Sequence, residues 1–134
     1  MGVIFDTSEI ITLERNRGQI EEIVLGREDE LFGISVITVA ELLHGVERAD
    51  TETRKIKRQA FVEKVIDFFP VYSVDVTVAR IYARLWASLA QKNLTVGAHD
   101  LIIAATAMAL NYTVITSNLR DYKKIEGLKI EEKN

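Results

Sequence analysis

Short apolar segments of strand length alternate along this chain with longer segments of helical periodicity, and this alternation limits the possible folds more than any other feature. Strands are expected at residues 3–5, 33–37, 71–74, 112–116 and 128–130. Helices are expected after residue 6 and over residues 38–45, 53–69, 75–93 and 100–111, with shorter helical turns at 19–25 and 117–124. This order favours an α/β fold whose mainly parallel sheet is covered by helices on both faces.

Two of the expected helices carry further information. The helix at residues 75–93 has Asp75 as a plausible cap and an apolar stripe at helical spacing. The stripe consists of Val78, Tyr82, Leu85, Trp86 and Leu89. The helix at residues 100–111 is apolar nearly all round, which predicts that it lies in the core. Its first residues are therefore expected in a partly buried place.

Size and composition indicate one domain that spans residues 1–134, because 48% apolar residues can fill a single core. Cysteine is absent, which excludes disulfides, thiolate zinc sites and cysteine nucleophiles. No apolar run approaches the roughly 20 residues that a membrane helix needs, and the first residues do not resemble a signal peptide. A cytoplasmic location without membrane contact is the resulting expectation.

Four carboxylates stand where strands end or helices begin: Asp6, Glu41, Asp100 and Asp121. Each has a simpler explanation, since Asp6 and Asp100 suit helix caps, Asp121 suits a turn, and Glu41 completes a capping box that starts at Thr38. Caps need not share a location, however. Parallel sheets bind ligands beyond the carboxyl ends of their strands, and this order of elements places all four acids near that edge.

Crowded carboxylates repel one another, so such a group needs a raised pKa or a neutralising cation. Oxygen ligands of this kind suit Mg²⁺ or Mn²⁺, and the lack of cysteine with only two histidines disfavours zinc. His99 adjoins Asp100 and could touch the site, although a surface or packing role is favoured. His44 is expected on the helix of Glu41 without a ligand role.

Taken together, four segments resemble the PIN-domain ribonucleases, and most of all the VapC toxins of toxin–antitoxin pairs. They are IFDTS at 4–8, SVITVAELLHG at 35–45, HDLIIAATA at 99–107 and VITSNLRDY at 114–122. The resemblance covers essentially the whole chain. It implies a three-layer α/β/α fold, an acidic metal site made by Asp6, Glu41, Asp100 and Asp121, and polar support from Thr7, Thr116 and Asn118.

The last motif leaves the metal count open. In this family an acid often occupies the place of Asn118, the place of Asp121, or both, and here only Asp121 is charged. Tyr122 stands where an aromatic residue, often phenylalanine, is common. The resemblance also implies a homodimer and a cognate antitoxin whose tail fills the groove at the acids.

We expect endonucleolytic cleavage of single-stranded or looped RNA, because a shallow acidic crevice cannot read a closed duplex. The net charge of −3 means that phosphates must be held by local positive charge. Candidate phosphate contacts are Arg54, Lys57, Arg58, Arg84, Arg120 and Lys124. Activity should then weaken as salt rises.

Two alternatives remain at this point. A receiver or haloacid-dehalogenase-like phosphoryl-transfer domain also places acids beyond parallel strands, but the dehalogenase pattern would need a second acid where Ser8 stands. A non-catalytic module that keeps the PIN-like fold and binds RNA or a protein partner is the other alternative, and a test of RNA cleavage would separate it from a nuclease.

Overall fold

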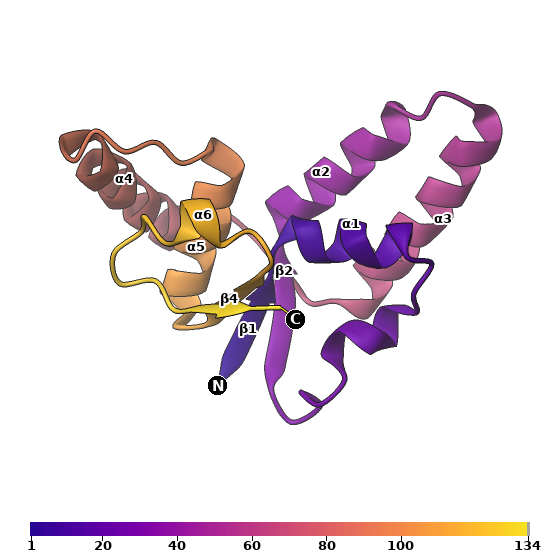
Figure 1. Ribbon diagram of the computed structural model, residues 1–134, viewed down its shortest axis with the longest axis horizontal. Helices are drawn as coiled ribbons and strands as arrows, with labels where there is room; N and C mark the ends of the chain where they lie inside the picture. The colour runs from indigo at the N-terminus through magenta and orange to yellow at the C-terminus, as the bar shows by residue number, and fades with distance from the viewer. Residues whose placement is uncertain (134) are drawn as a thin grey trace.

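The computed structural model describes residues 1–133, and its five strands form one sheet in the order β3-β2-β1-β4-β5 (Figure 1). All four neighbouring pairs are parallel. The strands are β1 (Gly2–Phe5), β2 (Leu31–Ser35), β3 (Val71–Tyr72), β4 (Thr113–Thr116) and β5 (Ile130–Glu132). The expected α/β fold with a mainly parallel sheet is confirmed.

Helices cover both faces of this sheet. They are α1 (Thr7–Arg15), the 3₁₀ helix η1 (Ile20–Val24), α2 (Val36–Glu47), α3 (Glu52–Phe68), α4 (Val76–Gln91), α5 (Ala98–Leu110) and α6 (Leu119–Tyr122). Figure 1 shows α1, α2 and α3 on one side of the strands and α4, α5 and α6 on the other. This is the three-layer α/β/α arrangement that the family resemblance implies.

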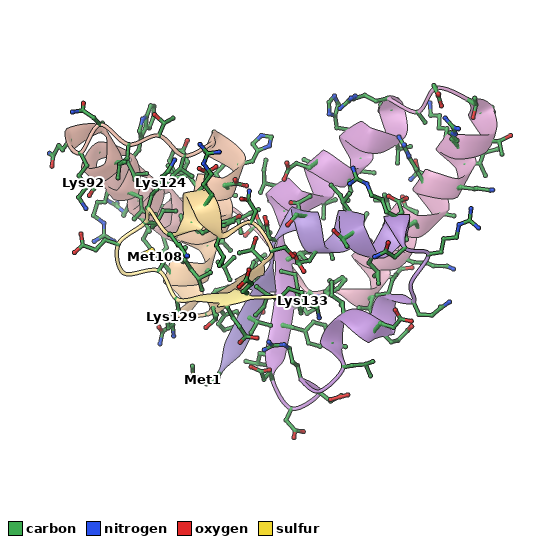
Figure 2. The ribbon with its side chains drawn as sticks, in the orientation of Figure 1. Met1, Lys92, Met108, Lys124, Lys129 and Lys133 are labelled. Carbon is green, nitrogen blue, oxygen red and sulfur yellow. The ribbon has the colours of Figure 1, made fainter. Side chains whose placement is uncertain are left out.

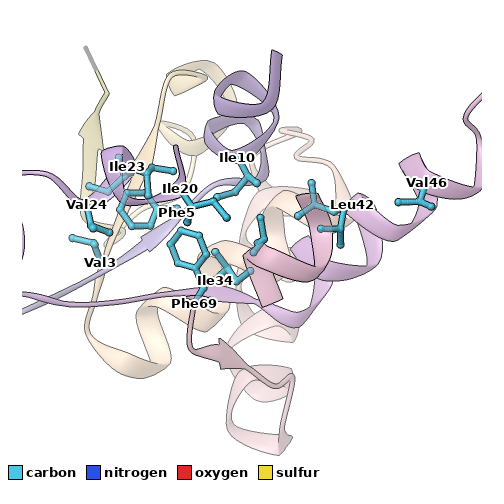
Figure 3. Packing of buried hydrophobic residues seen from close by; sticks show 13 residues of the cluster. Val3, Phe5, Ile10, Ile20, Ile23, Val24, Ile34, Leu42, Val46 and Phe69 are labelled. Atoms are coloured by element: carbon cyan, nitrogen blue, oxygen red, sulfur yellow. The ribbon is translucent and has the colours of Figure 1, made fainter. Parts of the chain in front are cut away.

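The central strand β1 explains why there are two layers of helices. Successive side chains of a strand point to opposite faces, so Val3 and Phe5 pack into one core cluster while Ile4 packs into the other. Figure 3 shows Phe5 surrounded by apolar side chains of the first cluster, including Ile10 and Phe69. All residues of β1 are buried, so close packing fixes the position of the strand and of Asp6 directly after it.

β1 is the middle strand of the sheet, and later strands lie on both sides of it. The chain adds β2 and β3 on one side of β1 and then crosses over to add β4 and β5 on the other side. The boundary between β1 and β4 is therefore the topological switch point, where α/β proteins bind ligands beyond the carboxyl ends of the strands. Asp6 follows β1 at this boundary, and Thr116 ends β4 beside it.

Several strand ends differ from the expected ones, and β3 for example ends at Tyr72 rather than at residue 74. The strand predicted at 33–37 ends at Ser35, and α2 begins at Val36 rather than at Thr38. Ser35 caps the helix by accepting a hydrogen bond from the backbone N–H of Ile37 at 3.1 Å. The β-branched residues 36–38 favour strands by propensity, and this cap outweighs that preference.

The apolar stripe lies on α4 as expected, where Val78 and Leu89 are buried and Trp86 is 63% exposed. The last strand begins at Ile130 rather than at residue 128. Gly127 has a φ of 86°, so the chain is still turning just before Leu128 and becomes extended only afterwards.

Within residues 1–133, no helix has both the length and the apolar character that a bilayer span requires.

Candidate metal centre

Asp6 lies at the centre of the site and is held by three hydroxyl groups. Its Oδ2 accepts hydrogen bonds from Ser8 Oγ at 2.7 Å and from Thr116 Oγ1 at 2.8 Å. Its Oδ1 accepts one from the hydroxyl of Tyr122 at 2.8 Å. Asp6 is the N-cap residue of α1, but its side chain makes no capping bond. The simple capping explanation for Asp6 is therefore wrong.

Glu41 reaches the site from the second turn of α2. Its Oε1 accepts a hydrogen bond from Thr7 Oγ1 at 2.7 Å, and Thr7 in turn lies 2.9 Å from the hydroxyl of Thr38. Because Ser35 and not Thr38 caps this helix, the capping-box explanation for Glu41 is also wrong. The start of α2 at Val36 places Glu41 where Thr7, directly after Asp6, can hold it.

Asp100 lies in the first turn of α5, after the N-cap residue Gly97. It is therefore not the cap of its own helix. The Tyr122 hydroxyl is 3.5 Å from its Oδ1, so one phenol stands between the carboxylates of Asp6 and Asp100. Asp100 also lines an open hollow of about 370 Å³ together with Gly97, Ala98 and His99.

Asp121 completes the group from α6. Its Oδ1 accepts from Lys124 Nζ at 3.0 Å, and the same amino group donates to the carbonyl oxygen of Thr95 at 3.0 Å. This pair stabilises the short turn of α6 against the loop that precedes α5. Asp121 is therefore more than an isolated turn residue, because its position is tied to a neighbouring segment.

The pKa of Asp100 shows that the acids share one electrostatic environment. Burial raises this pKa first, and the negative charges of Asp6, Glu41 and Asp121 raise it further, to about 6. Burial and the charges of Asp6 and Asp100 also raise the pKa of Tyr122, so its phenol stays protonated and acts as a hydrogen-bond donor. The four acids from distant segments thus lie close enough to repel one another.

The donor set fits a hard divalent cation, because it consists of carboxylate oxygens with hydroxyl groups around them. The acids are not arranged as a finished cage, however: among the described residues, no three acidic or histidine side chains are placed to hold an ion together. Magnesium demands oxygen ligands at about 2.0–2.1 Å. Magnesium usually keeps several waters and binds through one or two carboxylates, so the remaining acids would act through water.

A family model for the PIN domain matches residues 3–128 of the chain. The chain belongs to the PIN-domain family. Its relatives place it among the VapC-type members. It is 38% identical over 130 residues to "Ribonuclease VapC1" of Rickettsia felis, covering 97% of this chain and 95% of that protein. It is 35% identical over 99 residues to the "tRNA(fMet)-specific endonuclease VapC" of Salmonella typhimurium, covering 74% of this chain and 73% of that protein.

Solved structures agree with this assignment. The PIN fold of this chain superimposes on DNA-bound VapBC from Salmonella typhimurium with a TM-score of 0.88 at 30% identity, covering 98% of each chain. The match to VapBC2 from Rickettsia felis, bound to a promoter DNA fragment, has a TM-score of 0.84 at 26% identity and covers all of both chains. PIN-domain nucleases generally depend on a divalent metal.

The predicted polar supports of this PIN domain lie beside the acids. Thr7 bonds to Glu41, and Thr116 bonds to Asp6. Asn118 contributes its backbone N–H, which donates to Thr116 Oγ1 at 2.9 Å, while the residue itself is exposed. His99 Nδ1 lies 3.4 Å from Glu41 Oε2, so this histidine does reach the site although its side chain is exposed. His44 is exposed in the last turn of α2.

The predicted phosphate contacts do not form one cluster. Arg54, Lys57 and Arg58 lie on α3, where Arg54 pairs with Asp50 and Arg58 donates to the carbonyl oxygen of Gly45. Arg84 is exposed on α4. Arg120 and Lys124 belong to the segment around α6, next to Asp121, and Figure 2 places Lys124 on the α4–α6 side of the molecule, opposite α3. Of these side chains, Lys124 is the one for which the structure gives a bond to one of the four acids.

Sequence reasoning missed two groups at the site. The aromatic position of Tyr122 in the last motif gives no sign that its hydroxyl bonds to Asp6. Glu9 was not singled out at all, although it is 5% exposed and accepts hydrogen bonds from Ser117. An acid in the first turn of a helix resembles an ordinary capping residue, which hides its role.

Proposed function

We propose that this chain is an endoribonuclease that depends on a divalent metal and that Asp6, Glu41, Asp100 and Asp121 form its catalytic metal site. The observation that carries the proposal is the convergence of Asp6 and Asp100 on the Tyr122 hydroxyl, and the pKa of Asp100, raised by burial and by the charges of the other three acids, supports it. Acids that crowd at the switch point of a parallel sheet are what a metal-dependent phosphodiesterase needs. Membership of the PIN family favours this function over a phosphoryl-transfer receiver or haloacid-dehalogenase-like domain.

The acids divide into a central and a flanking pair. Asp6 and Asp100 share the Tyr122 hydroxyl and are proposed as the central ligands. Glu41 and Asp121 each contact an outer group, His99 or Lys124, and are proposed to act directly or through water. One of these carboxylates would serve as general base toward the attacking water. A bound divalent ion lowers the pKa of water and polarises a phosphodiester oxygen.

Magnesium or manganese is the proposed ion. The side chains at the four acids offer carboxylate and hydroxyl oxygens, and His99 adds an imidazole nitrogen near Glu41. Hard oxygen ligands select Mg²⁺ and Mn²⁺, whereas zinc favours cysteine and histidine.

Single-stranded or looped RNA is the proposed substrate. The relative from Salmonella typhimurium is named as a tRNA(fMet)-specific endonuclease, and tRNA exposes unpaired loops. Arg120 and Lys124 adjoin the acids and are the better candidates for phosphate contacts. Arg54, Lys57, Arg58 and Arg84 lie on α3 and α4 and remain candidates for a longer RNA.

An antitoxin is the proposed protein partner, and the chain is proposed as the toxin of such a pair. The matched structures from Salmonella typhimurium and Haemophilus influenzae are VapBC complexes. An antitoxin segment with a basic side chain would complement the negative charge around Asp100. The homodimer, the cytoplasmic location and the folding of residues 1–134 as one domain stay predictions.

The decisive experiment is an RNA cleavage assay with the purified protein. The chain should cleave mixed RNA internally in Mn²⁺ or Mg²⁺ and stop in chelator, and Asp6→Asn should lower the rate at least about 100-fold. Asp29→Asn is the matched control, because Asp29 is exposed near the amino end of β2, away from the acids. RNA binding without cleavage under all conditions would support the non-catalytic module instead.

A further inference from the structure

Glu9 is a buried carboxylate next to the metal site for which the proposed mechanism has no role. It lies in the first turn of α1 and is 5% exposed. Its Oε2 accepts hydrogen bonds from the backbone N–H of Ser117 at 2.9 Å and from Ser117 Oγ at 2.7 Å. A buried carboxylate is costly unless it is hydrogen-bonded, and these two bonds meet that requirement. Ser8 Oγ, which donates to Asp6 at 2.7 Å, lies 3.4 Å from the same Glu9 oxygen and makes a longer contact.

The simpler explanation for Glu9 is a capping box with Asp6. In that motif the acid three residues after the cap accepts a hydrogen bond from the backbone N–H of the cap residue. Here the backbone N–H of Asp6 donates instead to the carbonyl oxygen of Ile115 at 3.0 Å and continues the pairing of β1 with β4. The Glu9 side chain therefore does not close a capping box and bonds to Ser117.

Ser117 occupies a key place in the chain, because it joins β4 to α6. Thr116 directly before it donates to Asp6, and Asn118 directly after it donates its backbone N–H to Thr116. The short helix α6 that follows carries Asp121 and Tyr122. A group that fixes the position of Ser117 therefore also fixes where α6 begins, and with it the positions of Asp121 and Tyr122.

We propose that Glu9 is a positioning residue of the nuclease: by holding Ser117, it sets Thr116 on Asp6 and orients the turn that carries Asp121 and Tyr122. This inference rests on the proposed function. Glu9 acts through Ser117 and is not assigned as a metal ligand. Catalytic geometry is sensitive to such support, since a displacement of about 1 Å can cost about 100-fold in rate.

The test compares Glu9→Ala with Glu9→Gln in steady-state RNA cleavage with Mn²⁺. Glu9→Ala should lower kcat at least about tenfold, because the turn that carries Asp121 and Tyr122 is displaced, and KM should rise by a smaller factor, since Arg120 lies on the same turn. Glu9→Gln should stay close to the wild type, since its amide oxygen still accepts from Ser117. Ser117→Ala should fall between them, because the backbone N–H bond to Glu9 remains.

A control separates positioning from general loss of stability. Val65 is fully buried in α3, away from the acids, so Val65→Ala should lower the melting temperature and leave kcat unchanged. An unchanged kcat in Glu9→Ala would overturn the proposal. An equal loss of kcat in Glu9→Gln and Glu9→Ala would also overturn it, because the charge and not the acceptor would then be what matters.

A second measurement needs no activity. Amide hydrogen exchange at Ser117 and Asn118 should be faster in Glu9→Ala than in the wild type and close to wild type in Glu9→Gln. If the wild type fails to cleave RNA with Mn²⁺, the proposed function is contradicted, and this exchange still decides whether Glu9 holds the turn. Unchanged exchange in Glu9→Ala would contradict the inference alone.

Discussion

Three hydroxyl groups hold the carboxylate of Asp6 by hydrogen bonds. Ser8, Thr116 and Tyr122 each donate to its carboxylate, and Asp6 is 4% exposed. Such bonds to an ionised group are roughly twice as strong as bonds between neutral groups. They keep Asp6 oriented before any ion arrives, which lowers the cost of arranging the site when an ion binds.

Asp100 gives a pH-dependent prediction. Its pKa in the folded chain, about 6, is above the 3.8 of an unperturbed carboxyl. The folded chain therefore binds this proton more tightly, so the stabilisation is complete below pH 4 and is lost as the pH rises to about 6. In chelator, Asp100→Asn should equal the wild type in stability near pH 4 and exceed it above pH 6. The gain should be on the order of 1 kcal/mol, because solvent screens this partly exposed group.

Thermal denaturation of both proteins from pH 4 to pH 7 measures this difference. Asp29→Asn, which removes an exposed acid, should show no such trend. A constant difference between Asp100→Asn and the wild type across this range would contradict the raised pKa.

The order of strands and helices predicts that four acids lie near one edge of the sheet, and Asp6 and Asp100 do share the Tyr122 hydroxyl there. It was not enough to predict their partners. Tyr122 and Glu9 contact residues more than 100 positions away, and such contacts exist only after β1 and β4 have paired. Local patterns also misled, because Thr38 to Glu41 has the spacing of a capping box while Ser35 provides the actual cap.

At the scale of elements, strands and helices were predictable in kind and order, and their ends were less so. The apolar helix near residue 100 is buried as expected, with Leu101, Ile103 and Ala104 in the core. The start of α2 moved because one side-chain cap outweighed the strand preference of three β-branched residues. The start of β5 depended on where the turn at Gly127 ends.

Close packing of β2 against the segment before β3 gives a prediction at this scale. A Cβ atom at Gly33 would meet the Tyr72 ring and would lie 2.7 Å from the carbonyl oxygen of Pro70. That carbonyl accepts the hydrogen bond of the Ile34 N–H, so it cannot move freely. Gly33→Ala should therefore lower the free energy of unfolding by about 1–3 kcal/mol, as overpacking does.

Urea denaturation measures this change, and Gly45 provides a matched control. Gly45 lies inside α2, and a Cβ atom there meets nothing within 4 Å. Gly45→Ala should therefore raise the free energy of unfolding by about 0.5–1 kcal/mol, because alanine favours helices. If Gly33→Ala behaved like Gly45→Ala, the close approach of β2 to Pro70 would be wrong.

At the scale of the whole molecule, the fold separates stability from the site. Two apolar clusters on opposite faces of the sheet hold the layers together. The acids lie at the carboxyl edge of the sheet, at the boundary between β1 and β4. Asp6 follows β1, and the other three acids come from α2, α5 and α6. The chain has a net charge of −3, and the acids at this edge form a local region of negative charge. This region attracts a cation, and it repels RNA phosphates when no cation is bound. Metal and RNA binding should therefore be coupled.

Isothermal titration of the metal-free protein with Mn²⁺ tests the central claim most directly. The wild type and Asp29→Asn should bind Mn²⁺ with the same affinity, and Asp6→Asn should bind at least about tenfold more weakly because it loses a central carboxylate. Equal affinity in Asp6→Asn and the wild type, or no binding by the wild type, would contradict the assignment of the four acids as a metal centre.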